Sequence, residues 1–143
     1  MRRLADVMPG RELNRVTPGI SVLEAARFLV SHKTGTAAVF DGTKLVGVFS
    51  ERDLCTRVVA AGRDPARVLV REVMTPSPLT ASVSDTLEEC LVRMSGARCR
   101  HLPVFDGERY VGMVSMRDVT DAIAEALHGE LRDLREYLAG SGG

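Results

Sequence analysis

The sequence predicts an α/β fold made of two pseudo-twofold related helix–strand–strand–helix repeats, followed by a C-terminal helix. Three observations lead to this fold class. One block of sequence occurs twice, each copy places an Asp-Gly turn between two apolar strands, and amphipathic helices flank each pair of strands. Two such units bury their apolar faces most simply against each other, and this packing creates two related clefts where a small ligand can bind.

The duplicated block is the first of these observations. Residues 39–54 read VFDGTKLVGVFSERDL and residues 104–119 read VFDGERYVGMVSMRDV, at a constant offset of 65 positions. Upstream, Val7-Met8-Pro9 corresponds to Val73-Met74-Thr75, and each triplet opens a repeat. The organisation that follows is a first repeat, a linker with Gly and Pro, a second repeat, and an amphipathic helix with a flexible tail: residues 1–62, 63–72, 73–127 and 128–143.

The turns define the strands. Asp41-Gly42 and Asp106-Gly107 are strong hairpin signals, because glycine adopts the positive φ that a tight turn requires. The strands on either side of these turns are predicted at Thr36–Phe40, Leu45–Ser50, His101–Phe105 and Tyr110–Ser115.

Helical spacing of apolar residues predicts a helix before and after each hairpin. Thr17 and Thr80 precede the first helix of each repeat, and Glu24 and Asp85 are expected in the first turns, where an acidic residue suits the helix dipole. The apolar faces comprise Val22, Ala25, Ala26, Leu29 and Val30 in the first repeat and Leu87, Cys90, Leu91 and Met94 in the second. The closing helices are predicted over Arg52–Ala61 and Arg117–Leu127.

A Ser-x-x-Asp motif begins the closing helix of both repeats, at 50–53 and 115–118. As a stability device, the serine caps the helix and the aspartate completes a variant of the capping box. As a binding device, the carboxylate accepts hydrogen bonds from a ribose diol, while the hydroxyl and the free backbone N–H groups hold a phosphate. Arg52 and Arg117, inside the two motifs, add a cation for that phosphate.

With these motifs in order and in duplicate, the chain resembles a tandem cystathionine-β-synthase-type (CBS) domain pair, also called a Bateman module. The resemblance covers residues 4–127 and rests on the two Val-Met pairs, the Asp-Gly hairpins, the segment RHLPVFD, and the repeat ends VGVFSERDL and VGMVSMRDV. It implies a regulatory, non-catalytic sensor of an adenosyl ligand (AMP, ADP, ATP, NAD or S-adenosylmethionine) that signals to an effector protein. A ligand-free dimerisation scaffold is the alternative.

The resemblance also assigns roles to the motif residues. Asp53 and Asp118 would hold ribose hydroxyls, and Ser50 and Ser115 would contact phosphate or ribose. A threonine from the opposite repeat would complete each cleft. The resulting pairs are Thr17 with Asp118 and Thr80 with Asp53.

In the same family pattern, the strand after the first helix contacts adenine and phosphate. The positions are Thr34, Gly35, Thr36 and Ala37 in the first repeat and Cys99, Arg100, His101 and Leu102 in the second. Arg100 and His101 are good phosphate partners, and the first repeat has no comparable pair. The cleft of Ser115 and Asp118 is therefore expected to be the better site for a phosphorylated nucleotide.

Composition narrows the classes of function. The 19 basic and 19 acidic residues give a formal net charge of zero, which counts against a nucleic-acid-binding regulator or a membrane-surface protein. No apolar stretch approaches the roughly 18 residues of a membrane helix, and no secretory signal is present. Cys55, Cys90 and Cys99 lack CxxC spacing and are expected to be thiols in a reducing cytoplasm, with a redox switch as the alternative.

An enzyme acting on nucleotides is the alternative class of function. A catalytic pair of Asp53 and Asp118 is not favoured, since equivalent residues of the two repeats are expected to face separate clefts. The sequence has no P-loop and no GxGxxG motif, and His101 has no nucleophile motif beside it. Together with His32 and His128 it shows no metal-ligand spacing. We therefore expect no catalytic site and no metal site.

The C-terminal segment carries Leu127, Leu131, Leu134 and Leu138 at intervals of four, three and four, which is the stripe of a coiled coil. Because the stripe is shorter than two heptads, we expect it to pack on its own domain or on a second subunit that the body already contacts. Gly140 is expected to end the helix and begin a disordered GSGG tail. The resemblance implies a homodimer.

Overall fold

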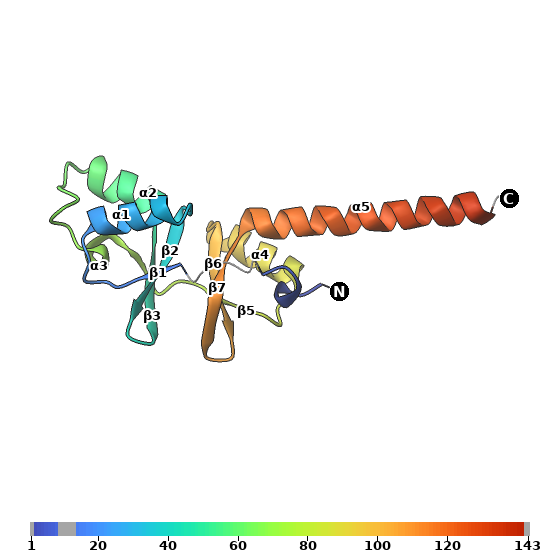
Figure 1. Ribbon diagram of the computed structural model, residues 1–143, viewed down its shortest axis with the longest axis horizontal. Coiled ribbons are helices and arrows are strands. Elements are labelled where there is room, and N and C mark those ends of the chain that lie inside the picture. Colours follow the sequence, from blue (N-terminus) through green and yellow to red (C-terminus); the bar gives the residue numbers. More distant parts are fainter. Residues whose placement is uncertain (1, 9–13, 142–143) are drawn as a thin grey trace.

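The computed structural model describes residues 2–8 and 14–141 and shows two similar halves, each built on one β-hairpin with helices beside it (Figure 1). The predicted order of helix, strand, strand and helix is confirmed in both halves, and the fold is mixed α/β. The first half contains β1 (Arg15–Val16), α1 (Val22–Ser31), β2 (Thr36–Asp41), β3 (Lys44–Ser50), α2 (Glu51–Asp53) and the π-helix η2 (Leu54–Val59). The second half contains β5 (Ala81–Ser82), α4 (Leu87–Ala97), β6 (His101–Asp106), β7 (Arg109–Ser115) and α5 (Met116–Ser141).

Both hairpins turn at a glycine. Asp41 pairs with Lys44 across the first hairpin, so that residues 42 and 43 form a two-residue loop. Gly42 has φ 61° and its counterpart Gly107 has φ 62°, a conformation that favours glycine. The predicted Asp-Gly turns are confirmed, with the aspartate as the last residue of the strand and the glycine as the first residue of the loop.

The starts of α1 and α4 test the predicted charge pattern. Glu24 lies in the first turn of α1, as expected. α4 begins after Thr86, whose side chain accepts the Glu89 N–H at 3.1 Å. Asp85 lies before this cap, so its expected place in the first turn is wrong. Its carboxylate instead accepts a hydrogen bond from Arg93 Nη1 at 2.9 Å, which ties the entry loop to the helix.

The apolar faces of α1 and α4 fill two separate cores. The predicted core residues Val22, Ala25, Leu29, Leu87, Cys90 and Met94 are buried, and Ala26 and Leu91 are half-buried. Val30 is the exception, since its side chain is 79% exposed. Successive residues of a helix point about 100° apart, so Val30 turns to solvent when Leu29 faces the core.

Each half completes its core with a segment from outside its own repeat. η1 (Leu4–Asp6) packs in the second half, whose sheet has the order β5-β6-β7, and the side chain of Leu4 is fully buried there. α3 (Val70–Val73) and β4 (Thr75–Pro76) pack in the first half, whose sheet has the order β1-β2-β3-β4. Val68 and Val70 are buried in the first core, and the Val70 N–H donates to the Ile20 carbonyl at 3.0 Å. The two halves are therefore interlocked.

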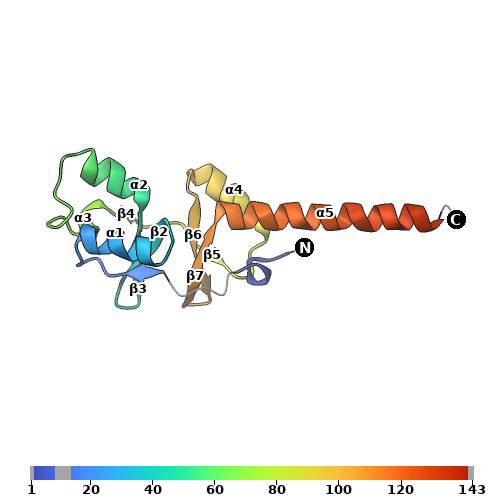
Figure 2. The ribbon, with the colours of Figure 1, turned by 45° about the horizontal axis from the view of Figure 1, so that its top comes forward.

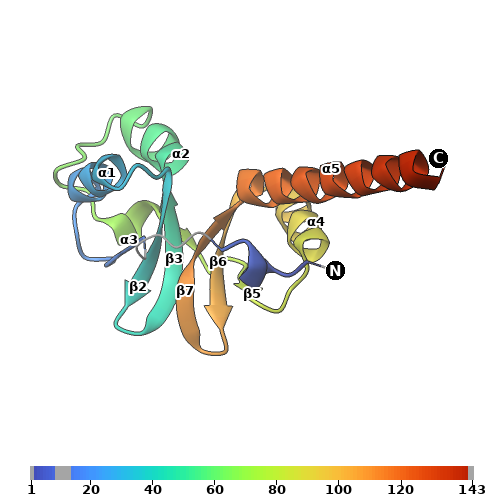
Figure 3. The same ribbon diagram turned by 45° about the vertical axis from the view of Figure 1, so that its right-hand side comes forward.

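The hairpins of the two halves lie side by side (Figures 1 and 3). Between them, Ala38, Phe40 and Tyr110 are buried in a third apolar cluster, and Phe105 packs against it. The ring centroids of Phe40 and Tyr110 are 4.9 Å apart, and those of Phe105 and Tyr110 are 5.6 Å apart. Tilted aromatic pairs at these distances stabilise the junction beyond the area they bury.

α5 runs without interruption from Met116 to Ser141 and projects from the body (Figures 1 and 2). The predicted helix ends at Leu127 and Gly140 are therefore both wrong, because the helix continues through Gly129 and Gly140. The last two residues of the predicted tail, 142–143, lie outside the described residues, and so does Pro9. Residues 131–140 are exposed, so the expected packing of this segment on its own domain is not observed. In the part of the chain that the structure describes, no helix is long and apolar enough to cross a membrane.

Candidate functional site

Both Ser-x-x-Asp motifs form capping boxes at the starts of the closing helices. In the second half, Ser115 Oγ accepts the Asp118 N–H at 3.0 Å and Asp118 Oδ2 accepts the Ser115 N–H at 3.0 Å. In the first half, the corresponding distances between Ser50 and Asp53 are 3.2 and 3.0 Å. The capping role predicted for both motifs is confirmed. It places each carboxylate at the positive end of a helix, where an anion or a polyol can also bind.

A cavity of about 160 Å³ lies next to the second motif. Ser115 and Asp118 border it from the second half, and Thr34 and Gly35 border it from the first. His101 lies on the same cavity. The remaining lining residues are Met8, Asn14, Lys33, Gly112 and Met113. Five of the predicted site residues are thus brought together at one junction between the halves.

His101 is the titratable group at the centre of this junction. Its Nδ1 lies 3.2 Å from the Thr36 hydroxyl, and the ring is partly buried. Burial lowers the pKa of His101 below its ordinary value of 6.5; the carboxylates of Asp118 and Glu51 oppose this shift, and the guanidinium of Arg100 adds to it. Burial therefore favours the neutral form of the imidazole.

Asp53, the counterpart of Asp118, lies in different surroundings. The residue is 6% exposed, and its Oδ2 accepts hydrogen bonds from both the N–H and the Oγ of Ser50, at 3.0 and 3.1 Å. Its Oδ1 lies 3.5 Å from the Thr75 hydroxyl and 3.8 Å from Arg57 Nε. Residue 122, which corresponds to Arg57 in the second repeat, is an alanine. The protein itself therefore satisfies the first carboxylate.

Other predicted site residues lie outside the cavity lining. Thr17, Thr80, Arg52, Arg100 and Arg117 are exposed, and Arg117 forms an ion pair with Asp121 at 3.7 Å. Ala37 and Leu102 are fully buried in the two cores, so only their backbone is available to a ligand. Thr36 is buried and Cys99 is half-buried.

Sequence reasoning missed Lys33, which borders the cavity and carries its positive charge. Lys33 has φ 52°, and Arg98, which occupies the equivalent position of the second repeat, has φ 55°. A basic residue at the same offset in both repeats was the available signal. Asn14 had no such signal, because nothing in its local sequence distinguishes it from an ordinary loop residue.

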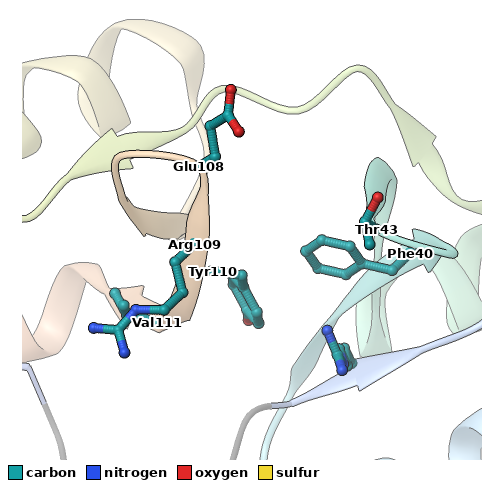
Figure 4. Close-up of a pocket in the computed structure, with 7 residues that line it drawn as sticks. Phe40, Thr43, Glu108, Arg109, Tyr110 and Val111 are labelled. Carbon is teal, nitrogen blue, oxygen red and sulfur yellow. The ribbon is translucent and has the colours of Figure 1, made fainter.

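A second and larger cavity of about 560 Å³ lies toward the tips of the hairpins. Figure 4 shows its two sides: Phe40 and Thr43 come from the first hairpin, and Glu108, Arg109, Tyr110 and Val111 come from the second. It contains no capping carboxylate. Some of its lining residues are sequence neighbours of those of the smaller cavity, since Arg15 follows Asn14 and Val111 precedes Gly112.

The side chains at this junction do not resemble a metal site. Among the described residues, no group of three or more His, Cys, Asp or Glu side chains is arranged to hold a metal ion. The three cysteines are free thiols: Cys55 is exposed, Cys90 is buried and Cys99 is half-buried. The pKa of Cys90 is raised to about 11, chiefly by burial, which makes this thiol a packing residue.

The architecture of interlocked hairpins and capped helices has clear relatives. The sequence model of the CBS domain matches residues 4–60 and again residues 70–125. This chain belongs to the CBS-domain family. The CBS domain-containing protein YhcV of Bacillus subtilis is 31% identical over 104 residues, which are 73% of this chain and 74% of that protein.

Solved structures support the same assignment for the CBS pair. The CBS-domain-containing protein ATU1752 from Agrobacterium tumefaciens is 32% identical, with a TM-score of 0.78 over 84% of this chain and 98% of the other. The CBS domain protein PAE2072 from Pyrobaculum aerophilum, solved in complex with AMP, is 24% identical and shows the same fold, with a TM-score of 0.74 over 81% and 88% of the two chains. The chain spans about a fifth of the length of three CBS domain-containing proteins of Arabidopsis thaliana that it matches.

Proposed function

We propose that this CBS pair is a non-catalytic sensor that binds one adenosyl ligand (AMP, ADP, ATP or NAD) beside Asp118 and signals its presence to a partner protein. The observation that carries the proposal is the contrast between the two motif carboxylates. Asp118 borders a cavity, whereas Asp53 is buried against Arg57 and Thr75. S-adenosylmethionine is the alternative ligand.

The chemistry of the cavity suits a nucleotide. The Asp118 carboxylate can accept hydrogen bonds from both ribose hydroxyls, as a carboxylate has about four acceptor positions. Lys33, the Ser115 hydroxyl and His101 border the same space and can neutralise or bind phosphate oxygens. Thr34 and Gly35 bring the loop after α1 against the ligand from the other half. A bound ligand would therefore join the two halves.

The size of the site favours one ligand that extends beyond the smaller cavity. Ligand pockets usually measure about 300–1,000 Å³, and the cavity at Asp118 measures about 160 Å³. The cavity of about 560 Å³ toward the hairpin tips would supply the missing volume, and the largely buried rings of Phe40 and Tyr110 border it. We therefore assign the base of the nucleotide to the side of the hairpin tips and the ribose to Asp118.

The signal would pass through α5. Asp118 lies in the first turn of this helix, which continues to Ser141 away from the body. A ligand that binds one arrangement of the halves more tightly than another shifts the population between them, and this difference in affinity is the whole signal. We further propose a homodimer, which the exposed apolar side chains Val30 in α1, Val59 in η2 and Val92 in α4 support. The free thiols fit a reducing cytoplasm.

The solved AMP complex of the Pyrobaculum aerophilum protein supports an adenosyl ligand for a protein of this fold. Regulation without catalysis is what the family resemblance implies. Turnover of ATP, AMP or NAD by the pure protein would contradict the proposal and favour a nucleotide-processing enzyme.

Calorimetric titration of the parent protein, Asp118→Asn and Asp53→Asn with AMP, ADP, ATP, NAD and S-adenosylmethionine tests the proposal. Hydrogen bonds to a charged group contribute about 1.5–3 kcal/mol, so Asp118→Asn should bind about tenfold to a hundredfold more weakly. Asp53→Asn is the matched control and should keep the parent affinity while it lowers the unfolding temperature. Equal loss in both variants would contradict the single site.

Two further comparisons sharpen the test. Lys33→Gln should weaken AMP binding and leave adenosine binding nearly unchanged, because only the phosphate contacts the ammonium group. A ligand that binds only the folded protein at about 100 times its Kd stabilises it by about 2.7 kcal/mol, which a thermal shift detects. No shift with any of the ligands would favour the ligand-free dimerisation scaffold.

A further inference from the structure

The distal half of α5 presents an apolar stripe to solvent. Leu127, Leu131 and Leu134 are 56%, 50% and 53% exposed, and Leu138 continues their spacing. Every residue from 131 to 140 is exposed, so no other part of the described chain covers this segment. The stripe faces away from the body, since the buried Val119 lies roughly a third of a turn from it round the helix and the buried Ala122 lies nearly half a turn from it.

A helix of this kind needs a partner to persist. Isolated helices of about 12–15 residues are marginal in water even with favourable sequences. The projecting segment also contains Gly129 and Gly140, which lower its intrinsic helix propensity. None of the ion pairs between described residues lies beyond Asp121, so intrahelical charge pairs do not supply the missing stability.

We propose that the distal half of α5 pairs with the same segment of a second copy of this chain in a parallel, in-register, two-stranded coiled coil. Leu127 and Leu134 occupy the d positions of a heptad, and Leu131 and Leu138 occupy the a positions. Each leucine then packs beside its own counterpart across a two-fold axis that runs along the helices. Both bodies lie at the same end of the pair.

Charge complementarity selects the parallel orientation. In this register Glu130 is at a g position and Arg135 at the following e position, the two positions that face each other across a parallel pair. The symmetric dimer thus contains two Glu130–Arg135 contacts between copies. An antiparallel pair instead sets e against e and g against g, which brings Arg135 toward Arg135 or His128 and Glu130 toward another Glu130 or Tyr137.

The seam continues toward the body through small residues. Ala124 and Thr120 extend the a and d positions in the N-terminal direction, and both are exposed. Small side chains let two helices approach closely where each emerges from its domain. The contact line therefore covers nearly three heptads, more than the leucines alone provide, and the paired bodies hold the helices at high effective concentration.

Disulfide trapping in the full-length chain tests the orientation. In a Cys55→Ser, Cys99→Ser background, Leu127→Cys and Leu134→Cys are each oxidised separately, with Glu136→Cys on the opposite face as the control. The parallel pair predicts rapid self-cross-linking at both 127 and 134 and little at 136. An antiparallel pair can bring at most one of these positions beside its own copy. Cross-linking at only one of them, at neither, or equally at 136 would overturn the proposal.

A charge swap gives an independent readout. Glu130→Arg and Arg135→Glu should each weaken self-association, on the order of fivefold to tenfold for two lost surface pairs that become repulsive. The double variant Glu130→Arg with Arg135→Glu should restore it. Residues five apart are not neighbours on one helix, so restoration can arise only between copies. Failure of the double variant to recover in sedimentation equilibrium would contradict the pairing.

This inference does not depend on the nucleotide site. The trapping experiment is carried out on the ligand-free protein. A negative ligand titration with positive trapping would therefore reject the proposed function alone.

Discussion

The Thr36 hydroxyl lies 3.2 Å from His101 Nδ1, although these residues occupy equivalent positions of the two repeats, 65 positions apart in the sequence. Each is the first residue of its central strand, and each pairs with the motif serine of its own half, Ser50 or Ser115. The two strands therefore begin at the point where the halves meet. Because one repeat carries threonine and the other histidine there, the two related clefts cannot be identical.

His101 should make the stability of the protein depend on pH. Its pKa is lowered in the folded state, so the unfolded chain binds the proton more readily. The free energy of unfolding should be highest above pH 6.5 and fall as the pH drops through this value, until the folded imidazole is protonated as well. Urea unfolding between about pH 5 and 8 measures the effect. His101→Gln should flatten the dependence, whereas the exposed His128→Gln should retain it.

A phosphorylated ligand should reverse this shift. A phosphate near His101 favours the imidazolium, so the pKa of His101 should rise when the ligand binds and affinity should increase as the pH falls. NMR titration of the imidazole with and without AMP checks both statements. If the pKa of His101 is the same in the complex as in the free protein, the phosphate does not lie near His101. Adenosine, which has no phosphate, is the matched control ligand.

Arg57 should stabilise the folded protein through its contacts around the Asp53 carboxylate. Its Nη1 donates to the carbonyls of Val73 and Met74 at 3.1 and 3.2 Å, and its Nε lies 3.8 Å from Asp53. The Arg57 side chain is about half exposed, which reduces the contribution of each charged contact. Arg57→Ala should therefore lower the free energy of unfolding by about 1–2 kcal/mol. Arg67→Ala, which removes an exposed ion pair, should change it by less than about 0.5 kcal/mol.

Gly47 should tolerate no side chain. A Cβ there would lie 2.7 Å from Met74 Sδ and 2.8 Å from the Thr75 carbonyl oxygen, because β4 packs directly against β3. Gly47→Ala should cost about 1–3 kcal/mol in urea unfolding. At Gly96, inside α4, a Cβ would meet no atom within 4 Å, and Gly96→Ala should stabilise the protein by up to about 1 kcal/mol. The opposite order of the two variants would contradict the packing of β4.

Several features followed from local sequence because their causes act over three or four residues. The Ser50 and Ser115 caps depend on an aspartate three positions away, and the turns at Gly42 and Gly107 depend on the φ of one residue. Both were predictable in type and place. The buried face of α1 was predictable except at Val30, because helical spacing does not say how wide a face the neighbouring strands cover.

The site was predictable only in part. The sequence indicated Ser115, Asp118 and His101, and the structure brings them to one cavity. The sequence equally indicated Asp53, but the carboxylate of Asp53 already contacts Arg57 and Thr75 within the protein. Arg57 lies four positions after Asp53, a helical spacing that the sequence could have indicated. Thr75 comes from the segment that crosses between the halves, 22 positions from Asp53, and no local pattern encodes that contact.

That this protein is a duplicated hairpin-and-helix unit could be read from the chain alone, since repetition, periodicity and turn chemistry are properties of neighbouring residues. Tertiary packing was needed to establish which half lends Leu4 and Val70 to the other, which carboxylate stays open to a ligand, and that α5 leaves the body as one long helix. These outcomes depend on contacts between residues tens of positions apart. The free energies of these contacts therefore cannot be assigned to any single segment of the sequence.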